Sequence, residues 1–184
     1  MYSDADIFAA IQSGDLVIDP YNEEYVSGAT VDLTLHTDFL VFRTGSTTHI
    51  DVKQPFDVTE KVQANSEDNS IVIHPGEFLL GSTAEKVGLS RKLAGVLEGR
   101  SSLGRLGLII HATASMIKPG FSGYLTLEIS NISHLPVKLY AGMRIAQLAL
   151  HELKTPARVG YSGSDKYQEQ DTPTASRIWH DFEK

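Results

Sequence analysis

Hydrophobic residues near the start of the chain recur at helical spacing. Within residues 3–13 three side chains form one apolar face, those of Ile7, Ala10 and Ile11. Ser3 is a suitable N-cap, Asp6 stands in the capping-box position three residues later, and Gly14 follows as a stop. The pattern predicts a short helix over residues 3–13, and no later segment predicts a second helix with similar clarity.

After this helix the chain changes to short apolar runs separated by turn residues. Residues 29–42 alternate apolar and polar positions before an apolar run, and residues 70–83 indicate a strand, a Pro-Gly turn and another strand. Further runs of strand type follow at 94–99, 107–114, 123–131, 137–142 and 145–153. This spacing predicts a mainly β fold, a sandwich or barrel, with one short N-terminal helix.

Two polar segments interrupt this pattern. Residues 57–69 are almost entirely polar and predict a loop, while the residues from about 160 to 184 are rich in Ser, Gly, Asp and Gln. No internal repeat or second domain boundary is visible, and 184 residues suit one domain. We therefore expect a single domain over residues 1–184 whose last part, about 160–184, forms a C-terminal arm.

Composition narrows the class of protein. The net charge is −7, which disfavours non-specific binding to nucleic acid, and no apolar run approaches the ~18 residues of a membrane helix. The chain has no cysteine, which excludes disulfides and cysteine-ligated zinc. The first residues lack the pattern of a signal peptide, so we expect a cytoplasmic protein with no nucleic-acid or membrane partner.

The segment 98–108, EGRSSLGRLGL, is the most unusual in the chain. It places four polar side chains, Arg100, Ser101, Ser102 and Arg105, between apolar runs. One interpretation is a surface turn with ion pairs. The other is a binding site for a small anion, since Arg offers forked donors, Ser offers hydroxyls and Gly permits close backbone approach.

Other candidate residues also allow two interpretations. Glu128 is either a solvent-facing residue of a half-buried strand or a general base with a raised pKa that faces a pocket. The segment 160–170 is either a polar tail or a lid that brings three side chains to a ligand, those of Tyr161, Lys166 and Gln170. The seven histidines show no metal-binding spacing, and His111 is expected to be a hydrogen-bonded core residue.

Four segments, in this order and spacing, resemble the dCTP deaminases, which are the deaminating branch of the trimeric dUTPase fold. They are EGRSSLGRLGL, HATASMIKPGFSGYLTLEISN, LYAGMRIAQLAL and SDKYQEQ. The resemblance covers nearly the whole chain. It implies a distorted β-barrel or jelly roll of the dUTPase-like type and a homotrimer with active sites between subunits.

The resemblance also implies a reaction: dCTP and water give dUTP and ammonia, a step toward dTMP synthesis. Family members use no zinc, and Mg²⁺ binds through the triphosphate of the substrate. dTTP commonly inhibits them by occupying the same site. The absence of cysteine agrees with the absence of zinc, because zinc-dependent nucleobase deaminases need cysteine ligands.

The family's functional residues fall on matching positions of this sequence. The resemblance makes Glu128 the catalytic base, with Ser101 and Arg105 as its supporting pair. Substrate contacts are implied for the rest of the loop, for the backbone of strand 123–131 and for the arm: Arg100, Ser102, Leu103, Gly104, Thr126, Leu127, Tyr161, Lys166 and Gln170.

One departure from the family pattern bears on the product. The turn that usually reads I-D-P-G, with an acidic residue at the sugar 3′-hydroxyl, here reads IKPG with Lys118. An ammonium group cannot accept a hydrogen bond, so the sequence favours deamination with release of dUTP. Two alternatives stay open: a bifunctional enzyme that forms dUMP and diphosphate, and a catalytically impaired nucleotide-binding trimer.

Overall fold

The N-terminal helix forms where the sequence predicts it. In the computed structural model, which describes residues 1–43, 45 and 47–183, helix α1 spans Asp4–Ser13. The Ser3 hydroxyl accepts a hydrogen bond from the Asp6 N–H, and the Asp6 carboxylate accepts one from the Ser3 N–H. Gly14 ends the helix at φ 75°, a left-handed conformation that glycine adopts without strain.

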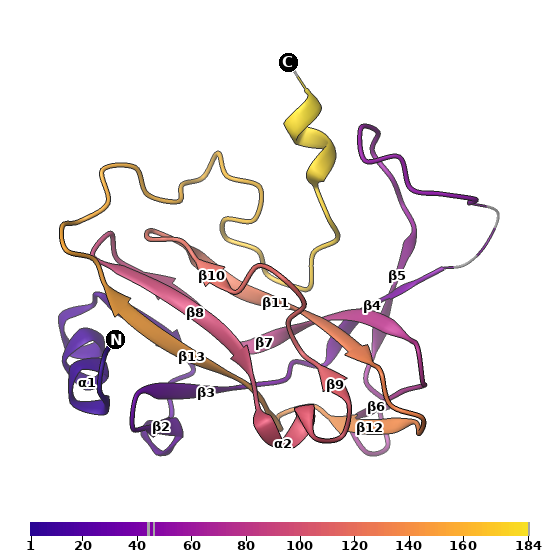
Figure 1. Cartoon of the computed structure of the whole chain (residues 1–184), viewed down its shortest axis with the longest axis horizontal. Coiled ribbons are helices and arrows are strands. Elements are labelled where there is room, and N and C mark those ends of the chain that lie inside the picture. The colour runs from indigo at the N-terminus through magenta and orange to yellow at the C-terminus, as the bar shows by residue number, and fades with distance from the viewer. Residues whose placement is uncertain (44, 46, 184) are drawn as a thin grey trace.

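Antiparallel strands build almost all of the remaining core (Figure 1). One sheet has the order β5-β4-β7-β11-β9, with β1 also paired to β7, and its strands are β1 (Leu16–Asp19), β4 (Asp38–Phe42), β5 (Thr59–Gln63), β7 (Phe78–Leu89), β9 (Leu108–Ile109) and β11 (Ser122–Asn131). A second sheet has the order β10-β8-β13-β3-β2, and its strands are β2 (Val26–Ser27), β3 (Thr30–Thr34), β8 (Leu93–Gly99), β10 (Met116–Ile117) and β13 (Arg144–Glu152). Strands β6 (Ser70–Ile73) and β12 (Val137–Tyr140) form a separate pair.

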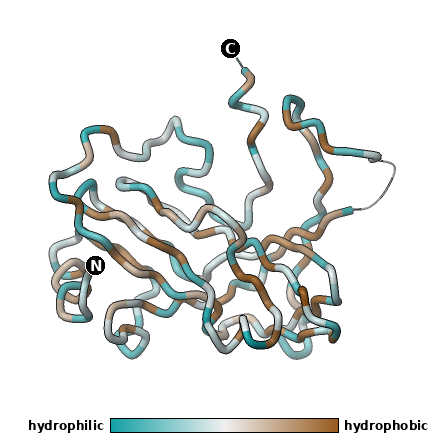
Figure 2. The backbone as a smooth tube through the Cα atoms, in the orientation of Figure 1, coloured by the Kyte–Doolittle hydropathy of each residue, from teal (hydrophilic) through white to brown (hydrophobic). Residues whose placement is uncertain are grey.

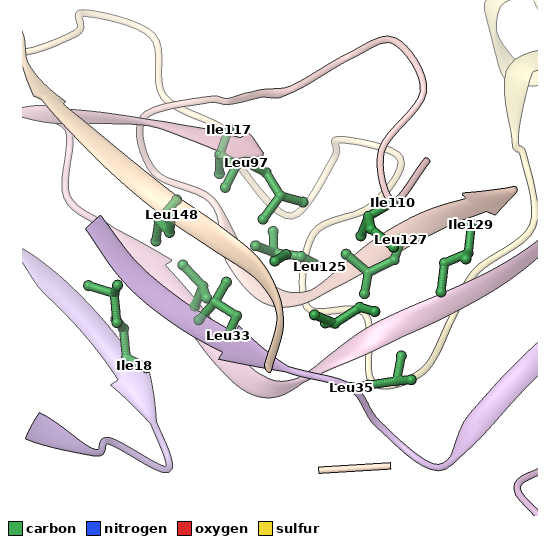
Figure 3. Packing of buried hydrophobic residues seen from close by; sticks show 14 of the residues in the cluster. Ile18, Leu33, Leu35, Leu97, Ile110, Ile117, Leu125, Leu127, Ile129 and Leu148 are labelled. Atoms are coloured by element: carbon green, nitrogen blue, oxygen red, sulfur yellow. The ribbon is translucent and has the colours of Figure 1, made fainter. Parts of the chain in front are cut away.

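The core lies where the inward faces of these strands meet. Leu33, Leu127 and Leu148 come from three different strands and are fully buried in one apolar cluster (Figure 3). In Figure 2 much of the hydrophobic colour follows the strands, whereas loops and turns carry most of the hydrophilic colour. Burial along β11 alternates residue by residue, as expected for a strand with one face in the core and one face outward.

Two local predictions need correction. Residues 57–69 are not only a loop, because β5 pairs with β4 within this segment; pairing with a neighbour can recruit a polar edge strand that its own sequence does not reveal. The strand, turn and strand expected within 70–83 are present as β6 and the first part of β7; β6 pairs with β12, and β7 continues to Leu89. A second helix, α2 (Ser101–Gly104), begins in the polar segment.

The chain after β13 forms an arm along the sheets. Residues 154–183 run back over the sheet that contains β11 and include the 3₁₀ helix η2 (Ile178–Phe182); another 3₁₀ helix, η1 (Glu23–Tyr25), precedes β2 (Figure 1). Lys184, the last residue of the expected arm, lies outside the described residues. Within the described ranges, no helix combines the length and apolar character needed to cross a bilayer.

Candidate active site

A cleft of about 680 Å³ lies between β11, the segment before and within β10, and the C-terminal arm. Its polar lining comes from all three parts of the chain: Glu128 and Thr126 on β11, His111, Ser115 and Lys118 on the segment around β10, and Tyr161, Asp165, Lys166, Tyr167, Gln170, Thr174, Ser176 and Asp181 on the arm. Apolar side chains such as Leu97, Ile117 and Leu125 close its inner wall. A partly apolar cleft with a few convergent polar groups is typical of a small-molecule site.

Glu128 faces this cleft because of the alternation along β11. Leu127 and Ile129 on either side of it are buried in the core, so its side chain points outward and is half-buried. The Ala112 N–H donates a hydrogen bond of 3.0 Å to the Glu128 Oε2. Its other oxygen, Oε1, has no hydrogen-bond partner within the described ranges, and Glu128 lines the cleft, so this oxygen is available for a ligand or water.

His111 lies beside Glu128 but not in the manner expected. Both of its ring nitrogens are buried, and neither has a hydrogen-bond partner among the residues that the structure describes. The prediction of a hydrogen-bonded core histidine is therefore wrong: the side chain lines the cleft instead. A strand-like apolar sequence around it gives no signal for this position, because the long-range packing of 111–118 against β11 and the arm creates the cleft.

The arm is held against β11 by backbone pairing. The Glu169 N–H donates to the Ser122 carbonyl at 2.8 Å, and the Tyr124 N–H donates to the Gln170 carbonyl at 3.0 Å. Gly123, at φ 149°, permits this approach, since a Cβ there would lie 3.1 Å from the Gln170 nitrogen. The arm thus continues the sheet beyond β11 and forms one wall of the cleft.

The structure brings the three predicted arm residues to the same cleft. The Tyr161 hydroxyl accepts a hydrogen bond from the Tyr167 N–H at 3.1 Å, and burial raises the pKa of Tyr161 above its ordinary value. The Lys166 Nζ lies 2.5 Å from an Asp181 carboxylate oxygen. Gln170 donates from its Nε2 to the Tyr124 carbonyl, while its Oε1 is buried with no partner within the described residues.

The loop residues of α2 stand apart from this cleft. None of residues 100–105 belongs to its lining as the described chain forms it, and α2 lies on the far side of the strands from the arm in Figure 1. Arg105 does accompany Ser101, with its Nε donating to the Ser101 Oγ at 3.4 Å, and both are exposed. Arg100 pairs with Asp32 at 3.3 Å, and Leu103 is buried in the core.

Residues 1–153 match the dCTP deaminase-like family, and the chain belongs to this family. Among its relatives are proteins named "dCTP deaminase, dUMP-forming". The one from Corynebacterium jeikeium is 47% identical, with 100% of this chain and 99% of the relative covered. The one from a Parafrankia species is 50% identical, with 99% and 92% covered.

A solved structure supports the assignment of the fold. The 2′-deoxycytidine 5′-triphosphate deaminase from Agrobacterium tumefaciens superposes with a TM-score of 0.62 and 20% identity. The superposition covers 81% of this chain and 46% of that protein, so the chain spans about half of its length. Together with the observed sheets, this similarity confirms the expected mainly β, dUTPase-like fold.

Proposed function

We propose that the protein is a bifunctional enzyme that deaminates dCTP and then removes diphosphate to form dUMP. The observation that carries this proposal is the name that its relatives share, dCTP deaminase, dUMP-forming, at 45–50% identity over at least 98% of the chain. These names favour the dUMP-forming alternative over release of dUTP. Lys118 in the IKPG turn remains the residue that argues for the simpler deaminase.

Glu128 is the proposed general base of the deamination. Its anchored carboxylate would take a proton from water as the oxygen attacks C4 of cytosine, and would pass protons to the departing amino group, which leaves as ammonia. The contact with the Ala112 N–H supports this role by fixing the carboxylate while Oε1 stays available. The chain has no cysteine for the zinc site of other nucleobase deaminases, which favours activation of water by a carboxylate.

The remaining cleft residues would bind the nucleotide. The backbone of Thr126, which lines the cleft, and of Leu127, whose side chain is buried in the core, would contact the cytosine. The buried Oε1 of Gln170, which has no partner among the described residues, could accept a hydrogen bond from a ligand. Tyr161 and Lys166 would contact the triphosphate, since an ammonium and a phenol both donate to phosphate oxygens. In the second step, water attacks the α-phosphorus of dUTP and diphosphate leaves.

Mg²⁺ fits this cleft as an ion that enters with the triphosphate. Within the described residues no group of three or more His, Asp or Glu side chains is placed to hold a metal ion. The cleft does offer single carboxylates, Asp165 and Asp181, that could contact a hydrated ion. When bound, Mg²⁺ would neutralise part of the phosphate charge.

A homotrimer would complete the site with α2 of a neighbouring subunit. Ser101 and Arg105 would then support the water and the developing charge near Glu128, and Arg100, Ser102, Leu103 and Gly104 would contact substrate. Apolar side chains beside α2, those of Leu106, Ile132 and Leu135, are 55%, 66% and 73% exposed in the single chain, which favours a subunit contact there. dTTP, a pyrimidine triphosphate, would compete for the same cleft.

Product analysis tests the function directly. The protein is incubated with Mg²⁺ and dCTP, and separately with dUTP, and the nucleotides are separated by chromatography. We expect dUMP, diphosphate and ammonia from dCTP, without build-up of dUTP. Accumulating dUTP would establish the simpler deaminase, and tight dCTP binding without any product would establish the impaired nucleotide-binding trimer.

The variant Glu128→Gln tests the base. The amide cannot accept a proton, so we expect deamination to fall by at least about 100-fold while dCTP still binds. Glu152→Gln serves as a control, because Glu152 is exposed at the end of β13 and outside the cleft lining. Normal turnover by Glu128→Gln would exclude Glu128 as the base.

A further inference from the structure

The two lysines of the cleft differ in their partners. Lys166 pairs with Asp181 at 2.5 Å, whereas no carboxylate of the described chain lies within ion-pair distance of Lys118. Instead the Lys118 Nζ lies 5.8 Å from the centre of the Tyr161 ring, at the distance of a weak cation–π contact. Lys118 therefore brings a positive charge to the cleft that no neighbouring carboxylate neutralises.

Tyr161 connects the two lysines. Its N–H donates to the carbonyl of Pro119, the neighbour of Lys118, at 2.7 Å, and its hydroxyl accepts from the N–H of Tyr167, the neighbour of Lys166, at 3.1 Å. The phenol ring is consequently fixed between the two parts of the chain that carry these lysines. Two ammonium groups in one cleft, on segments that this ring connects, form a suitable site for an extended anion.

Asp181 indicates what kind of group this site accepts. Its carboxylate comes from η2, near the end of the arm, and lines the cleft while it binds the Lys166 ammonium. A phosphate oxygen is the same type of acceptor as a carboxylate oxygen, with more negative charge. A phosphate chain that displaced Asp181 from Lys166 could extend toward Lys118, whose ammonium is exposed and needs no partner to be displaced.

We propose that Lys118 is a second phosphate-binding cation of the cleft, which acts with Lys166 on the triphosphate of the nucleotide. This inference rests on the proposed function for the identity of the nucleotide. It gives the lysine of the IKPG turn a binding role of its own, at a position where the family pattern has an acidic residue. Lys118 would thus raise the affinity for triphosphate rather than contact the base.

Direct binding of dCTP and of inorganic tripolyphosphate to the intact protein tests this role by calorimetry. Tripolyphosphate has no sugar or base, so it reports only on the phosphate site. We expect Lys118→Met to weaken both ligands about tenfold and to reduce the dependence of dCTP affinity on salt, because one ion pair is lost. Lys118→Arg, which keeps the charge, should restore most of the affinity.

Lys154→Met is the matched control, since it removes one exposed positive charge outside the cleft lining and should leave both affinities unchanged. The proposal is overturned if Lys118→Met binds dCTP like the wild type. It is also overturned if that variant loses dCTP affinity but retains tripolyphosphate affinity, which would locate Lys118 at the sugar. All proteins in this comparison carry Glu128→Gln, in which dCTP binds without appreciable turnover, so a failure of the proposed reaction would be seen separately, as missing dUMP from the protein with Glu128.

Discussion

At the scale of single residues, a buried carboxylate joins the two large sheets. Glu85 on β7 is 4% exposed, and its two oxygens accept hydrogen bonds from the Thr34 N–H at 2.9 Å and the Thr34 hydroxyl at 2.6 Å. Burial raises the pKa of Glu85, and the hydrogen bonds from Thr34 oppose this effect without cancelling it. Burying the charged form therefore has a cost that depends on pH.

We expect Glu85→Gln to become progressively more stable than the wild type as the pH rises. Below the ordinary pKa of a glutamate, Glu85 is protonated in both the folded and the unfolded wild type, so it adds no pH dependence. Above that pKa the unfolded chain loses the Glu85 proton while the folded protein keeps it. The stability of the wild type therefore declines with rising pH until the raised pKa of Glu85 in the folded protein is passed. Within that window the difference in unfolding free energy should grow by up to about 1.4 kcal/mol per pH unit. The glutamine can retain both contacts, as acceptor from the Thr34 N–H and donor to its hydroxyl.

Urea unfolding of both proteins between pH 4 and pH 8 measures this difference. Glu60→Gln, an exposed glutamate on β5, is the control and should run parallel to the wild type. A constant difference between Glu85→Gln and the wild type across the whole range would mean that Glu85 does not titrate with a raised pKa.

At the scale of elements, β11 and the arm together make the cleft. The strand supplies a rigid base for Glu128, and the arm adds hydrogen bonds along the free edge of the strand. Gly120 in the turn before β11 determines how closely the arm approaches: at φ +87° it adopts a conformation that disfavours other residues, and a Cβ there would lie 2.8 Å from the Tyr161 carbonyl oxygen.

Gly120→Ala should therefore disturb the arm more than the core. We expect a loss of about 1–3 kcal/mol in stability from backbone strain, and a raised KM for dCTP because Tyr161 and Lys166 move from the cleft. Gly163→Ala is the control within the arm, since nothing lies within 4 Å of its added Cβ. Thermal unfolding measures the loss of stability, and steady-state kinetics measures the KM for dCTP. An unchanged KM for Gly120→Ala would show that the contact between Gly120 and the arm is dispensable for binding.

At the scale of the whole molecule, the single chain separates two sets of predicted site residues. The cleft holds Glu128 and the arm, while Ser101 and Arg105 lie on α2 with exposed apolar side chains nearby. The Gly107 carbonyl accepts the Ile132 N–H at 2.9 Å, which holds the loop after α2 against the turn that follows β11. This surface is suited to contact another subunit.

Mixing two inactive variants should therefore restore activity. Glu128→Gln and Arg105→Ala each lack one half of the proposed shared site, so co-refolded mixtures should contain about a quarter of intact sites if those halves come from different subunits. Each variant alone, refolded in the same way, is the control. Light scattering should give a mass about three times the 20.1 kDa of the single chain. If a mixed trimer recovers no deaminase activity, the site does not combine these residues across subunits.

Local patterns were sufficient where the physical cause is local. The capping residues of α1 and the alternation along β11 act over a few neighbouring positions, and both were predicted correctly. The strand β5 was missed because its polar residues gain their structure by pairing with β4. The place of His111 in the cleft and the pairing of Lys166 with Asp181 were also not predicted, since they depend on contacts between distant parts of the chain.

The sequence by itself determined the class of fold, the half-exposed position of Glu128, the presence of an arm and the resemblance to the dCTP deaminases. These follow from residue periodicity, composition and motif order, which need no knowledge of long-range contacts. Only the tertiary structure decided that Glu128, Lys118, Tyr161, Lys166 and Gln170 share one cleft while α2 lies outside it. The reason is that strand pairing and arm docking join residues far apart in the chain, such as Asp32 with Gln147 and Tyr124 with Gln170, and no local pattern encodes which edges will meet.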